Sequence, residues 1–425
     1  MPVATFTPLN VAIIGAGLNG ISAAIALRRS GHTCTIYERR DLAAEVGNSI
    51  SCAKNGGQWL HRWGVDVPSG RPIDLQVLTL RDYKSGEVDM EYDLSQYEAK
   101  WGFPYYMFHR QDMHKMLLDC ALSEEGEGPP AKLVCLSGAQ AIDFDSTTVT
   151  FTNGTSATFD MVLGADGVVI MNLDPTITSA SSSCYRCNVY TDKCKELGLD
   201  KFTERYWGGM ETDDVNKYLK IVMSPCNGGD IVSFYVFFPA ELAKTKQEGF
   251  TVEDIPLEDV IAPFGQLDPD CVLALRHSVD RKPWRLYRHT PLERWTNKKV
   301  ALLGAACHAM MPHQSQGACQ GIEDAAALGV LFSSKYNYTQ NIEEGLKMYE
   351  KIRKPRAERV QYCSYLATED IRERIGFSSL PGSKTQGSVK PVKPVKGHVR
   401  FTIGEINGYD LEAHLDEVAA AEWKA

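Results

Sequence analysis

Three glycines near the amino terminus have the spacing of a phosphate-binding turn. Gly15, Gly17 and Gly20 directly follow the short apolar run 11–14, and residues 21–29 have the pattern of a helix. Gly15 permits a tight turn, Gly17 lets a pyrophosphate approach the backbone, and Gly20 lets the helix pack closely on the strand. The amino terminus of that helix offers amide groups and positive dipole charge to phosphates. The spacing therefore predicts a dinucleotide site on a βαβ unit.

An acidic residue stands at the end of the second predicted strand. Residues 34–37 form that strand, and Glu38 follows it. A carboxylate here accepts hydrogen bonds from the ribose hydroxyls of a bound dinucleotide, which argues against a 2′-phosphate at this position. The alternative is a glycine-rich turn that binds nothing. The βαβ unit by itself does not distinguish NAD from FAD.

Composition limits the class of protein. The chain has 425 residues and a formal net charge of −9, so it has room for two or three domains and no general attraction for nucleic acid or anionic lipid. No apolar run reaches about 18 residues, and the first ten residues lack the features of a signal peptide. We therefore expect a protein without a membrane span, located in the cytoplasm.

Cysteines are numerous but scattered. The chain has 12 of them, and without a secretory signal we expect reduced, mostly buried thiols. Cys184, Cys187 and Cys194 form the one cluster, and a zinc site there would need Cys226 as its fourth ligand. No second CxxC pair is present, so we expect no metal.

Hydrophobic periodicity locates the remaining elements. Helices are expected at 109–122, 317–332 and 341–375, and a loop followed by a helix is expected at 45–65. Strands are expected within 73–98, within 133–163 with a hairpin turn at Asn153-Gly154, at 299–303, and through most of 184–285 as a separate antiparallel layer. Residues 378–398 read as an exposed linker, and the last 25 residues as one further helix.

Four sequence blocks, taken together, resemble those of a known family. They are the glycine turn with Glu38, His109-Arg110-Gln-Asp112, Gly164-Ala-Asp166-Gly167, and Leu303-Gly304-Ala-Ala-Cys-His308 continuing through Pro312-His-Gln-Ser-Gln-Gly317 to Glu323-Asp324-Ala325. In order and spacing, over residues 9–360, the chain resembles class A flavoprotein monooxygenases of the salicylate-hydroxylase-like group, especially the fungal members.

The resemblance implies that the dinucleotide is FAD. The cofactor-binding residues that it implies are Gly15, Gly17, Gly20, Glu38, Arg39, Ser51, Arg110, Asp166, Gly167, Gly304, Ala305, Gln316, Gly317 and Ala318. The turn at 316–318 opens a helix, and a helix amino terminus directed at the flavin pyrimidine edge stabilises the negative charge of reduced flavin.

The chain departs from the family pattern at two places. Ala305 stands where the family has an aspartate that accepts a hydrogen bond from the ribityl chain, and Ile170 and Leu173 replace a serine and an arginine after Asp166-Gly167. These departures leave two alternatives open. One is an FAD-binding enzyme that does not transfer oxygen, such as a cyclase or a rearrangement catalyst in natural-product synthesis. The other is a non-enzymatic binding protein.

On the substrate side, the resemblance points to fewer residues. Tyr185-Arg186 matches a pair whose arginine orients a phenolate or carbonyl, and relatives place a tyrosine about 30 residues later, where Tyr218 or, by strand alignment, Ser224 stands. His313 is a candidate proton carrier near the flavin, and a purely structural loop histidine is an equal alternative. Trp284 and Tyr287 are expected in the core. The predicted catalytic residues are thus Arg186, Tyr218 and His313.

The resemblance also implies the architecture and the reaction. The expected fold is α/β, with a Rossmann-like FAD-binding domain, an interleaved antiparallel-sheet substrate domain and a C-terminal helical segment. The expected boundaries are 1–75, 103–175 and 286–360 for the FAD-binding domain, 76–102 and 176–285 for the substrate domain, and 361–425 for the C-terminal segment. NADPH or NADH reduces the flavin, O₂ adds at its C4a carbon, and one oxygen atom is transferred to a small aromatic or polyketide- or alkaloid-like metabolite by hydroxylation or epoxidation.

Overall fold

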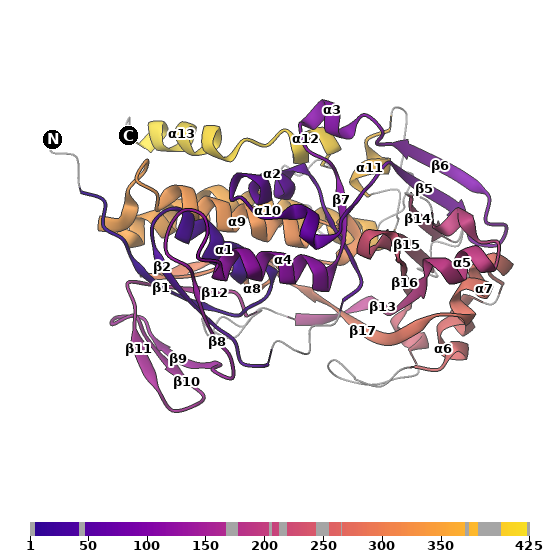
Figure 1. Ribbon diagram of the computed structural model, residues 1–425, viewed down its shortest axis with the longest axis horizontal. Helices are drawn as coiled ribbons and strands as arrows, with labels where there is room; N and C mark the ends of the chain where they lie inside the picture. Colours follow the sequence, from indigo (N-terminus) through magenta and orange to yellow (C-terminus); the bar gives the residue numbers. More distant parts are fainter. Residues whose placement is uncertain are drawn as a thin grey trace.

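The structure is a computed structural model. It describes residues 5–41, 47–166, 177–203, 206–211, 219–243, 255–264, 266–369, 374–380 and 401–422. Two sheets of different kinds dominate it and lie at opposite ends of the long axis in Figure 1.

A six-stranded sheet with the strand order β18-β19-β12-β1-β2-β8 carries the glycine turn. Its strands are β18 (Thr296–Asn297), β19 (Val300–Leu302), β12 (Met161–Gly164), β1 (Asn10–Ile14), β2 (Thr33–Tyr37) and β8 (Lys132–Val134). All neighbours pair in parallel except β18 and β19. The central strand β1 is apolar because it is buried on both faces, which is typical of a parallel sheet covered by helices.

Helices from distant parts of the chain pack together beside this sheet. They are α1 (Leu18–Arg29), α4 (Arg110–Leu122), α8 (Ala305–His308), α9 (Gly317–Leu331) and α10 (Ile342–Glu369). Helix α1 contacts both α4 and α9, and α10 packs on α9 (Figure 1). The predicted helices 109–122, 317–332 and 341–375 are confirmed, with α10 ending earlier than expected.

Two small sheets complete this part of the molecule. One has the order β11-β10-β9, with β9 (Ala139–Asp143), β10 (Thr148–Phe151) and β11 (Ser156–Thr158), and Gly154 in the β10–β11 turn has a φ of +83°, as the hairpin prediction requires. The other has the order β3-β7-β4, with β3 (Ser49–Cys52), β7 (Tyr106–His109) and β4 (Ile73–Asp74). The expectation of a loop before α2 (Lys54–Arg62) is therefore wrong, because β3 forms by pairing with β7 about 57 residues later.

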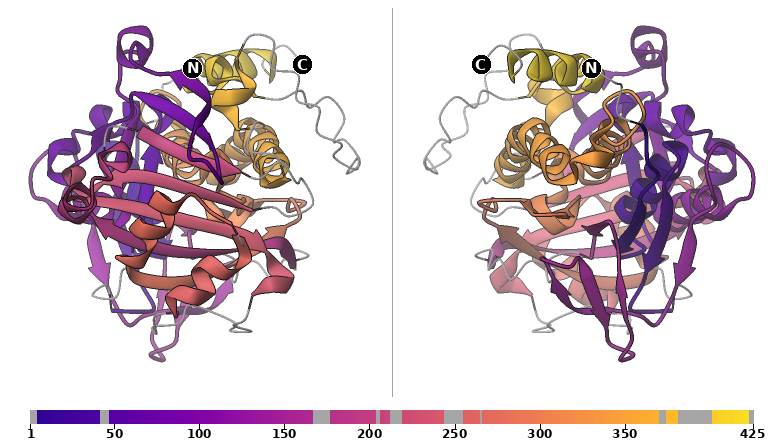
Figure 2. Two further views of the ribbon diagram at one scale, coloured as in Figure 1. Left: turned by 90° about the vertical axis from the view of Figure 1, so that its right-hand side faces the viewer. Right: turned by 90° about the vertical axis from the view of Figure 1, so that its left-hand side faces the viewer.

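A seven-stranded sheet with the order β17-β13-β16-β15-β14-β5-β6 forms the second layer. Its strands are β5 (Val77–Asp82), β6 (Val88–Asp93), β13 (Ile177–Tyr190), β14 (Tyr206–Glu211), β15 (Lys220–Cys226), β16 (Ile231–Pro239) and β17 (Val279–His289). Every neighbouring pair is antiparallel except β14–β5, which confirms the antiparallel layer and the 73–98 hairpin. Figure 2 (left) shows this sheet in front.

The two faces of the seven-stranded sheet have different partners. Phe234, Val236 and neighbouring apolar residues of one face form a core with α5 (Thr191–Glu196), α6 (Leu257–Ile261) and α7 (Pro269–Arg276). Phe237 and Cys184 of the other face pack with Met311, which belongs to the chain around α8 and α9. The second face is therefore turned toward the glycine-turn part of the molecule.

The cysteine cluster is divided among separate cores. Cys184 lies in the group with Phe237, Cys187 and Cys194 lie in the core on the opposite face of the sheet, and Cys226 belongs to the large core of the other layer. Ten of the 12 cysteines are buried, in agreement with the expectation of mostly buried thiols. The four sulfur atoms do not converge on a common point.

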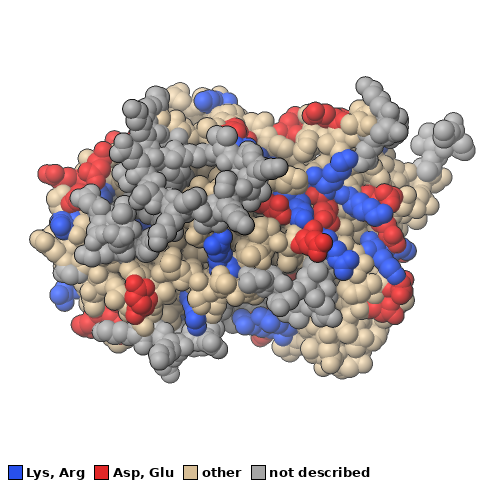
Figure 3. Space-filling view, turned by 180° about the vertical axis from the view of Figure 1, so that it is seen from behind, with Lys and Arg blue, Asp and Glu red and all other residues tan. Residues whose placement is uncertain are grey.

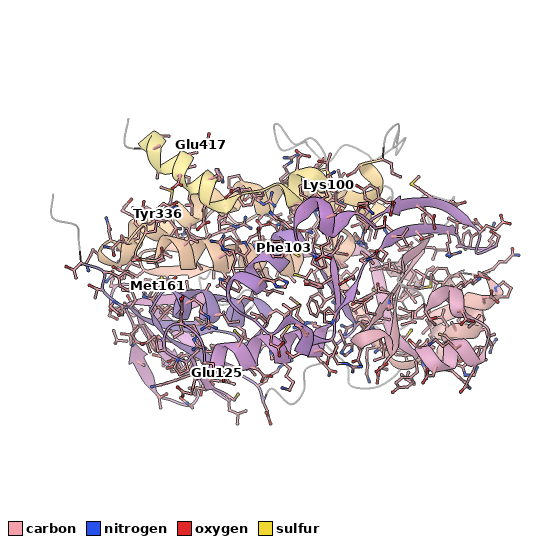
Figure 4. The ribbon with its side chains drawn as sticks, turned by 45° about the horizontal axis from the view of Figure 1, so that its top comes forward. Lys100, Phe103, Glu125, Met161, Tyr336 and Glu417 are labelled. Carbon is pink, nitrogen blue, oxygen red and sulfur yellow. The ribbon has the colours of Figure 1, made fainter. Side chains whose placement is uncertain are left out.

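The carboxyl-terminal region forms two helices after residue 400, so the expectation of one is wrong. Thr402 and Glu405 form a capping box that begins α12 (Ile403–Asn407), and α13 (Leu411–Glu422) follows after a break at Gly408. Figure 4 shows Glu417 on α13 on the same side of the molecule as Tyr336, whose hydroxyl donates to Asp416 at 2.5 Å. The predicted linker 378–398 lies almost wholly outside the described residues, while α3 (Tyr97–Trp101) and α11 (Ile375–Ser378) complete the helices.

Two surface properties bear on possible contacts with nucleic acid and membranes. On the face shown in Figure 3, basic and acidic side chains are interspersed rather than gathered by sign. Among the described residues, no helix combines the length and apolarity needed to cross a bilayer.

Candidate active site

The glycine turn has the geometry that its sequence predicts. Gly15 has a φ of +111°, and its amide donates to the Tyr37 carbonyl at 2.8 Å. A Cβ on Gly20 would lie 2.0 Å from the Gly15 carbonyl oxygen, so only glycine allows α1 to approach the turn this closely. A Cβ on Gly17 would meet nothing within 4 Å. The turn therefore leaves open space at the amino terminus of α1, where a phosphate would approach.

Glu38 lies beside this turn. Its Oε2 accepts from the amide of Ala16 at 3.0 Å, and its Oε1 accepts from the amide of Arg40 at 2.9 Å. These two bonds fix the carboxylate at the end of β2, where a ribose would need it. Arg39 is exposed, so its predicted cofactor contact stays a prediction.

Three parallel strand ends bring distant blocks to one edge of the six-stranded sheet. Ile14 of β1 pairs with Gly164 of β12, which pairs with Leu302 of β19. The turns that follow these strands therefore lie side by side, as ligand-binding loops do at the carboxyl edge of a parallel sheet. Asp166 lies half-buried in the second of these turns, and Gly167 lies outside the described residues.

The third turn contains Gly304 and Ala305. Gly304 has a φ of +61°, and its amide donates to Asp324 Oδ2 at 2.9 Å. A Cβ at Gly304 would lie 2.0 Å from Asn19 Nδ2, so the turn and α1 meet without room for a side chain. Ala305 begins α8 and is exposed, so its methyl group does not fill any packed space.

A helix amino terminus forms the next part of the site. Helix α9 begins at Gly317 after Gln316, and no side chain caps it, which leaves its first amide groups available to a ligand. Ser51 Oγ donates to the Ser315 carbonyl at 3.2 Å, and Asn55 Nδ2 donates to Gln316 Oε1 at 3.0 Å. Residues of β3 and α2 therefore hold the turn that contains the predicted residues 316–318.

Arg110 lies near this group. It is the first residue of α4, is half-buried, and its amide donates to the Asn48 carbonyl at 2.9 Å. The amino terminus of α4 thus lies next to β3, so Arg110 and Ser51 belong to the same side of the site.

A largely buried ion network connects α9 with α10. Arg353 donates to Glu323 Oε2 at 2.5 Å and to Asp324 Oδ1 at 2.8 Å, and Arg356 donates to Glu323 Oε2 at 2.7 Å. The His308 ring lies 2.6 Å from Asp324 Oδ2. Burial alone would raise the pKa of Asp324, but His308 and Arg353 outweigh it and lower that pKa to about 2. The network therefore holds both acids ionised and fixes the position of α9.

This network was not predicted in the sequence. Arg353 and Arg356 lie three residues apart on a helix that reads as charged and exposed, so they share one face. That spacing, opposite the adjacent acids Glu323 and Asp324, is the one signal that points to it.

Three potential metal ligands also lie together here. The Cys307 sulfur lies within 4.8 Å of the His308 and Asp324 ligand atoms, but the Asp324 oxygens already accept bonds from Gly304, His308 and Arg353.

Strand register places the substrate-side candidates. Arg186 of β13 pairs with Tyr235 of β16, which pairs with Val222 of β15, so these side chains point to the same face of the sheet. The neighbouring row contains Cys184, Phe237, Lys220 and Trp284. The Arg186 guanidinium carbon lies 5.2 Å from the centre of the Trp284 ring. Arg186 is thus surrounded by aromatic side chains on the face that is turned toward the glycine-turn layer.

His313 meets this face from the other layer. It lies in the 3₁₀ turn Pro312–Gln314 just before α9, and its ring centre lies 4.7 Å from that of Phe237. Burial, assisted by the charges of Lys220 and Arg374, lowers the pKa of His313 well below its ordinary value. Its Nε2 has no hydrogen-bond partner among the described residues. His313 is therefore a neutral imidazole between the sheet and the start of α9.

Several substrate-side expectations change. Tyr218 lies outside the described residues, and Ser224 pairs with Ser233, one row away from Arg186. The tyrosine that stands beside Arg186 is Tyr235, which the sequence reasoning missed. Trp284 is half-buried over Arg186, and Tyr287 is 37% exposed, so the core expectation is wrong for Tyr287 because β17 is an edge strand.

The residues present fit FAD. Gly17 leaves open space at the start of α1, the Glu38 carboxylate is fixed beside that turn, and no side chain caps the start of α9. Ala305 supplies no acceptor, and the FAD contacts of the other predicted residues stay predictions.

Comparisons with known proteins agree with this site. The family model for "FAD binding domain" matches residues 161–363, and that for "FAD dependent oxidoreductase" matches residues 10–129. The chain is 31% identical to hispidin-3-hydroxylase of Neonothopanus nambi, in an alignment that covers 86% of this chain and 93% of that protein. It is 29% identical to the FAD-dependent monooxygenase cfoG of Aspergillus candidus, over 88% of this chain and 90% of that protein, and 27% identical to 3-hydroxybenzoate 6-hydroxylase of Klebsiella oxytoca, over 83% and 86%.

Solved structures show the same fold. A salicylate hydroxylase in complex with its substrate matches with a TM-score of 0.70 at 20% identity, covering 96% of this chain and 97% of that one. CtdE in complex with FAD and a substrate matches with a TM-score of 0.77 at 16% identity, covering 97% and 98%. The predicted α/β fold and the FAD cofactor are confirmed, and the relatives support oxygen transfer rather than the non-oxygenating alternative.

Proposed function

Because the chain belongs to the family of FAD-dependent monooxygenases, we propose that it hydroxylates an aromatic or heteroaromatic ring that carries an acidic hydroxyl group. Reduction by NADPH or NADH and consumption of O₂ are part of this proposal. The relatives' names include hydroxylases of hispidin and of 3-hydroxybenzoate, and the second compound carries a ring hydroxyl.

The observation that carries the proposal is the position of Arg186. It is 8% exposed, it pairs across the sheet with Tyr235, and its guanidinium carbon lies 5.2 Å from the centre of the Trp284 ring. A planar guanidinium in such surroundings binds an anionic oxygen strongly, because little water competes for it. Aromatic walls favour a flat ring. This face therefore suits a phenolate or an enolate.

His313 has the properties of a hydrogen-bond acceptor for the substrate hydroxyl. Its imidazole is neutral, and its Nε2 has no partner among the described residues. It lies against Phe237, in the row next to Arg186. Its lowered pKa makes it a weak base, so in our proposal it accepts a hydrogen bond from the ring hydroxyl as the proton leaves. Arg186 stabilises the negative oxygen that remains, which makes the ring electron-rich.

The cofactor side has a different task. Bound FAD supplies the redox chemistry and the activation of O₂. The residues Gly15, Gly17 and Glu38 hold its adenosine diphosphate half in this proposal. The uncapped start of α9 at Gly317 stabilises negative charge at the other half. The ion network around Glu323 keeps that helix end in position.

A direct test uses the purified, flavin-loaded protein. We expect a yellow protein whose NADPH oxidation rises when hispidin or 3-hydroxybenzoate is added, with a product that contains one more oxygen atom. Arg186→Gln should raise KM for the ring substrate by about tenfold or more, since a charge-assisted hydrogen bond is lost. Arg281→Gln is the control, because among the described residues Arg281 bonds to the backbone carbonyls of Ile255 and Ser278.

Two outcomes would overturn the proposal. A flavin that neither NADPH nor NADH reduces, with or without either ring compound, would exclude a monooxygenase cycle of this kind. An equal effect of the two arginine substitutions on KM would exclude the assigned role of Arg186.

A further inference from the structure

We propose that a buried hydrogen-bonded latch fixes the aromatic face of the seven-stranded sheet against the cofactor side, and that it acts as a positioning device for the reaction. The latch consists of Asn48 and Ser49 on one side and Asn188, Ser233 and Tyr235 on the other. The proposal rests on the proposed function, since it assumes that the ring substrate binds at Arg186.

The contacts of the latch are short and directional. Asn48 Nδ2 lies 2.9 Å from Ser233 Oγ and 3.1 Å from Asn188 Oδ1. The amide of Ser49 donates to Ser233 Oγ at 3.1 Å, and the Tyr235 hydroxyl donates to the Ser49 carbonyl at 2.6 Å. Two consecutive residues are therefore tied to two neighbouring strands of the sheet.

Four of the five members of the latch are buried, and Tyr235 is half-buried. Ser233 is 0% exposed, Asn48 4% and Asn188 5%. Polar groups at this depth cost free energy unless they are bonded, so a displaced latch would leave several of them unpaired. Apolar packing alone tolerates small sliding, whereas this set of bonds is satisfied in one register only. That is the property that a positioning device needs.

The latch is connected to both halves of the site. Asn188 and Ser233 pair with each other in the row next to that of Arg186 and Tyr235, two residues away along each strand. That offset corresponds to about 7 Å. On the other side, the Asn48 carbonyl accepts from the amide of Arg110 at 2.9 Å.

The strand that begins at Ser49 extends this connection. It continues to Ser51, whose hydroxyl donates to the Ser315 carbonyl just before α9. A shift at the latch would therefore change the spacing between Arg186 and the start of α9. Misplacement by about 1 Å is enough to reduce a positioned reaction strongly.

The test compares two buried serines of the same layer. Ser233→Ala removes two hydrogen bonds of the latch. Ser278→Ala removes one bond to the Leu275 carbonyl, and Ser278 is 4% exposed. Asn188→Ala removes the bond to Asn48 Nδ2 and leaves Tyr235 beside Arg186 unchanged, so it serves if Ser233→Ala does not fold. Each flavin-loaded variant is measured for product formed per NADPH oxidised, with hispidin as the probe, and for amide hydrogen exchange in residues 47–52.

The expected results separate positioning from stability. In Ser233→Ala, exchange at 47–52 should speed up by about tenfold or more, as loss of two hydrogen bonds implies. Product per NADPH should fall by about threefold or more, while FAD affinity changes by less than about twofold, because poorly placed substrate leaves the oxygen to be released as peroxide. Ser278→Ala should lower the unfolding temperature without either effect.

Each negative result has a distinct meaning. Unchanged exchange at 47–52 in both latch variants would refute the latch, and this measurement needs no substrate. Faster exchange with unchanged product per NADPH would refute its positioning role. A third outcome combines two results: the wild type hydroxylates neither hispidin nor 3-hydroxybenzoate, while Ser233→Ala still exchanges faster at 47–52. That outcome would count against the proposed function and against positioning, and would leave the latch as a structural contact.

Discussion

Replacing Gly304 by alanine should destabilise the protein through two separable effects. The backbone at Gly304 has a φ of +61° and a ψ of −137°, a region that essentially only glycine occupies, and a strained residue of this kind costs about 1–3 kcal/mol. A Cβ there would also lie 2.0 Å from Asn19 Nδ2, and overpacking costs about 1–3 kcal/mol more. The free energy of unfolding should therefore fall by about 2–6 kcal/mol.

Gly321 provides the matched case without strain. It lies inside α9, and a Cβ there would lie 2.2 Å from the same Asn19 side chain. Gly321→Ala should thus suffer the same steric conflict, but its helical backbone gains about 0.5–1 kcal/mol from the loss of glycine flexibility. The two glycines differ in backbone conformation and share one neighbour.

Asn19→Ala separates the two effects. The Asn19 Oδ1 has no hydrogen-bond partner among the described residues, so its removal alone should cost less than about 1 kcal/mol. In the Asn19→Ala background, Gly321→Ala should become neutral or stabilising. Gly304→Ala should recover only part of its steric cost, because Asn19 Cβ would still lie 2.8 Å from the added Cβ. The coupling free energy should be about 1–3 kcal/mol for both pairs.

Urea unfolding followed by circular dichroism, at saturating FAD, measures these free energies. A Gly304→Ala variant within about 0.5 kcal/mol of the wild type would refute the strain argument. Full rescue of Gly304→Ala by Asn19→Ala would refute the backbone part, and absence of any rescue of Gly321→Ala would refute the steric part.

Three further predictions concern the site itself. His313→Gln should lower kcat by about a hundredfold at pH 7 and restore part of it at higher pH, where the substrate hydroxyl ionises by itself, and a pH profile of kcat parallel to that of the wild type would contradict this. Asp324 should contribute about 2 kcal/mol to the free energy of unfolding above its unfolded pKa of 3.8, because its folded pKa is lowered to about 2. This contribution should be lost as the pH falls toward 2. Urea unfolding at several pH values measures it, and Asp324→Asn should flatten the profile. Ala305→Asp should tighten FAD binding by about tenfold or more, since an exposed position there can accept a charge-assisted bond; fluorescence titration measures it, and an equal gain in Ala305→Asn would show that the charge is not responsible.

Local sequence features were sufficient to predict the cofactor side. The glycine turn, Glu38 and the helix that starts at Gly317 follow from patterns within about 30 residues, where spacing alone fixes geometry. The structure forms the turn, the fixed carboxylate and the helix as predicted, and the confirmed long helices had strong periodicity. Short-range rules are reliable there because strand, turn and helix are consecutive.

The substrate side was predictable only in part, because it depends on register. Arg186 was found through its local pair with Tyr185, but Tyr235 lies 49 residues later and meets Arg186 only through the β13–β16 pairing. Shifting that pairing by one residue would turn Tyr235 to the opposite face, and no local pattern fixes it. The strand β3 was missed for the same reason, since its four residues form a strand only against β7.

The alanine at position 305 changes how firmly the cofactor is held, without changing the turn that holds it. The shape of that turn comes from Gly304, whose amide is fixed by Asp324, and Asp324 is itself fixed by Arg353. None of these bonds involves the side chain at 305, which is exposed. We therefore expect the missing aspartate to weaken one contact to FAD, by about 1.5–3 kcal/mol, and to leave the protein scaffold of the site intact. This is why the departure is compatible with membership of the monooxygenase family, and why its consequence should be sought in FAD affinity rather than in folding.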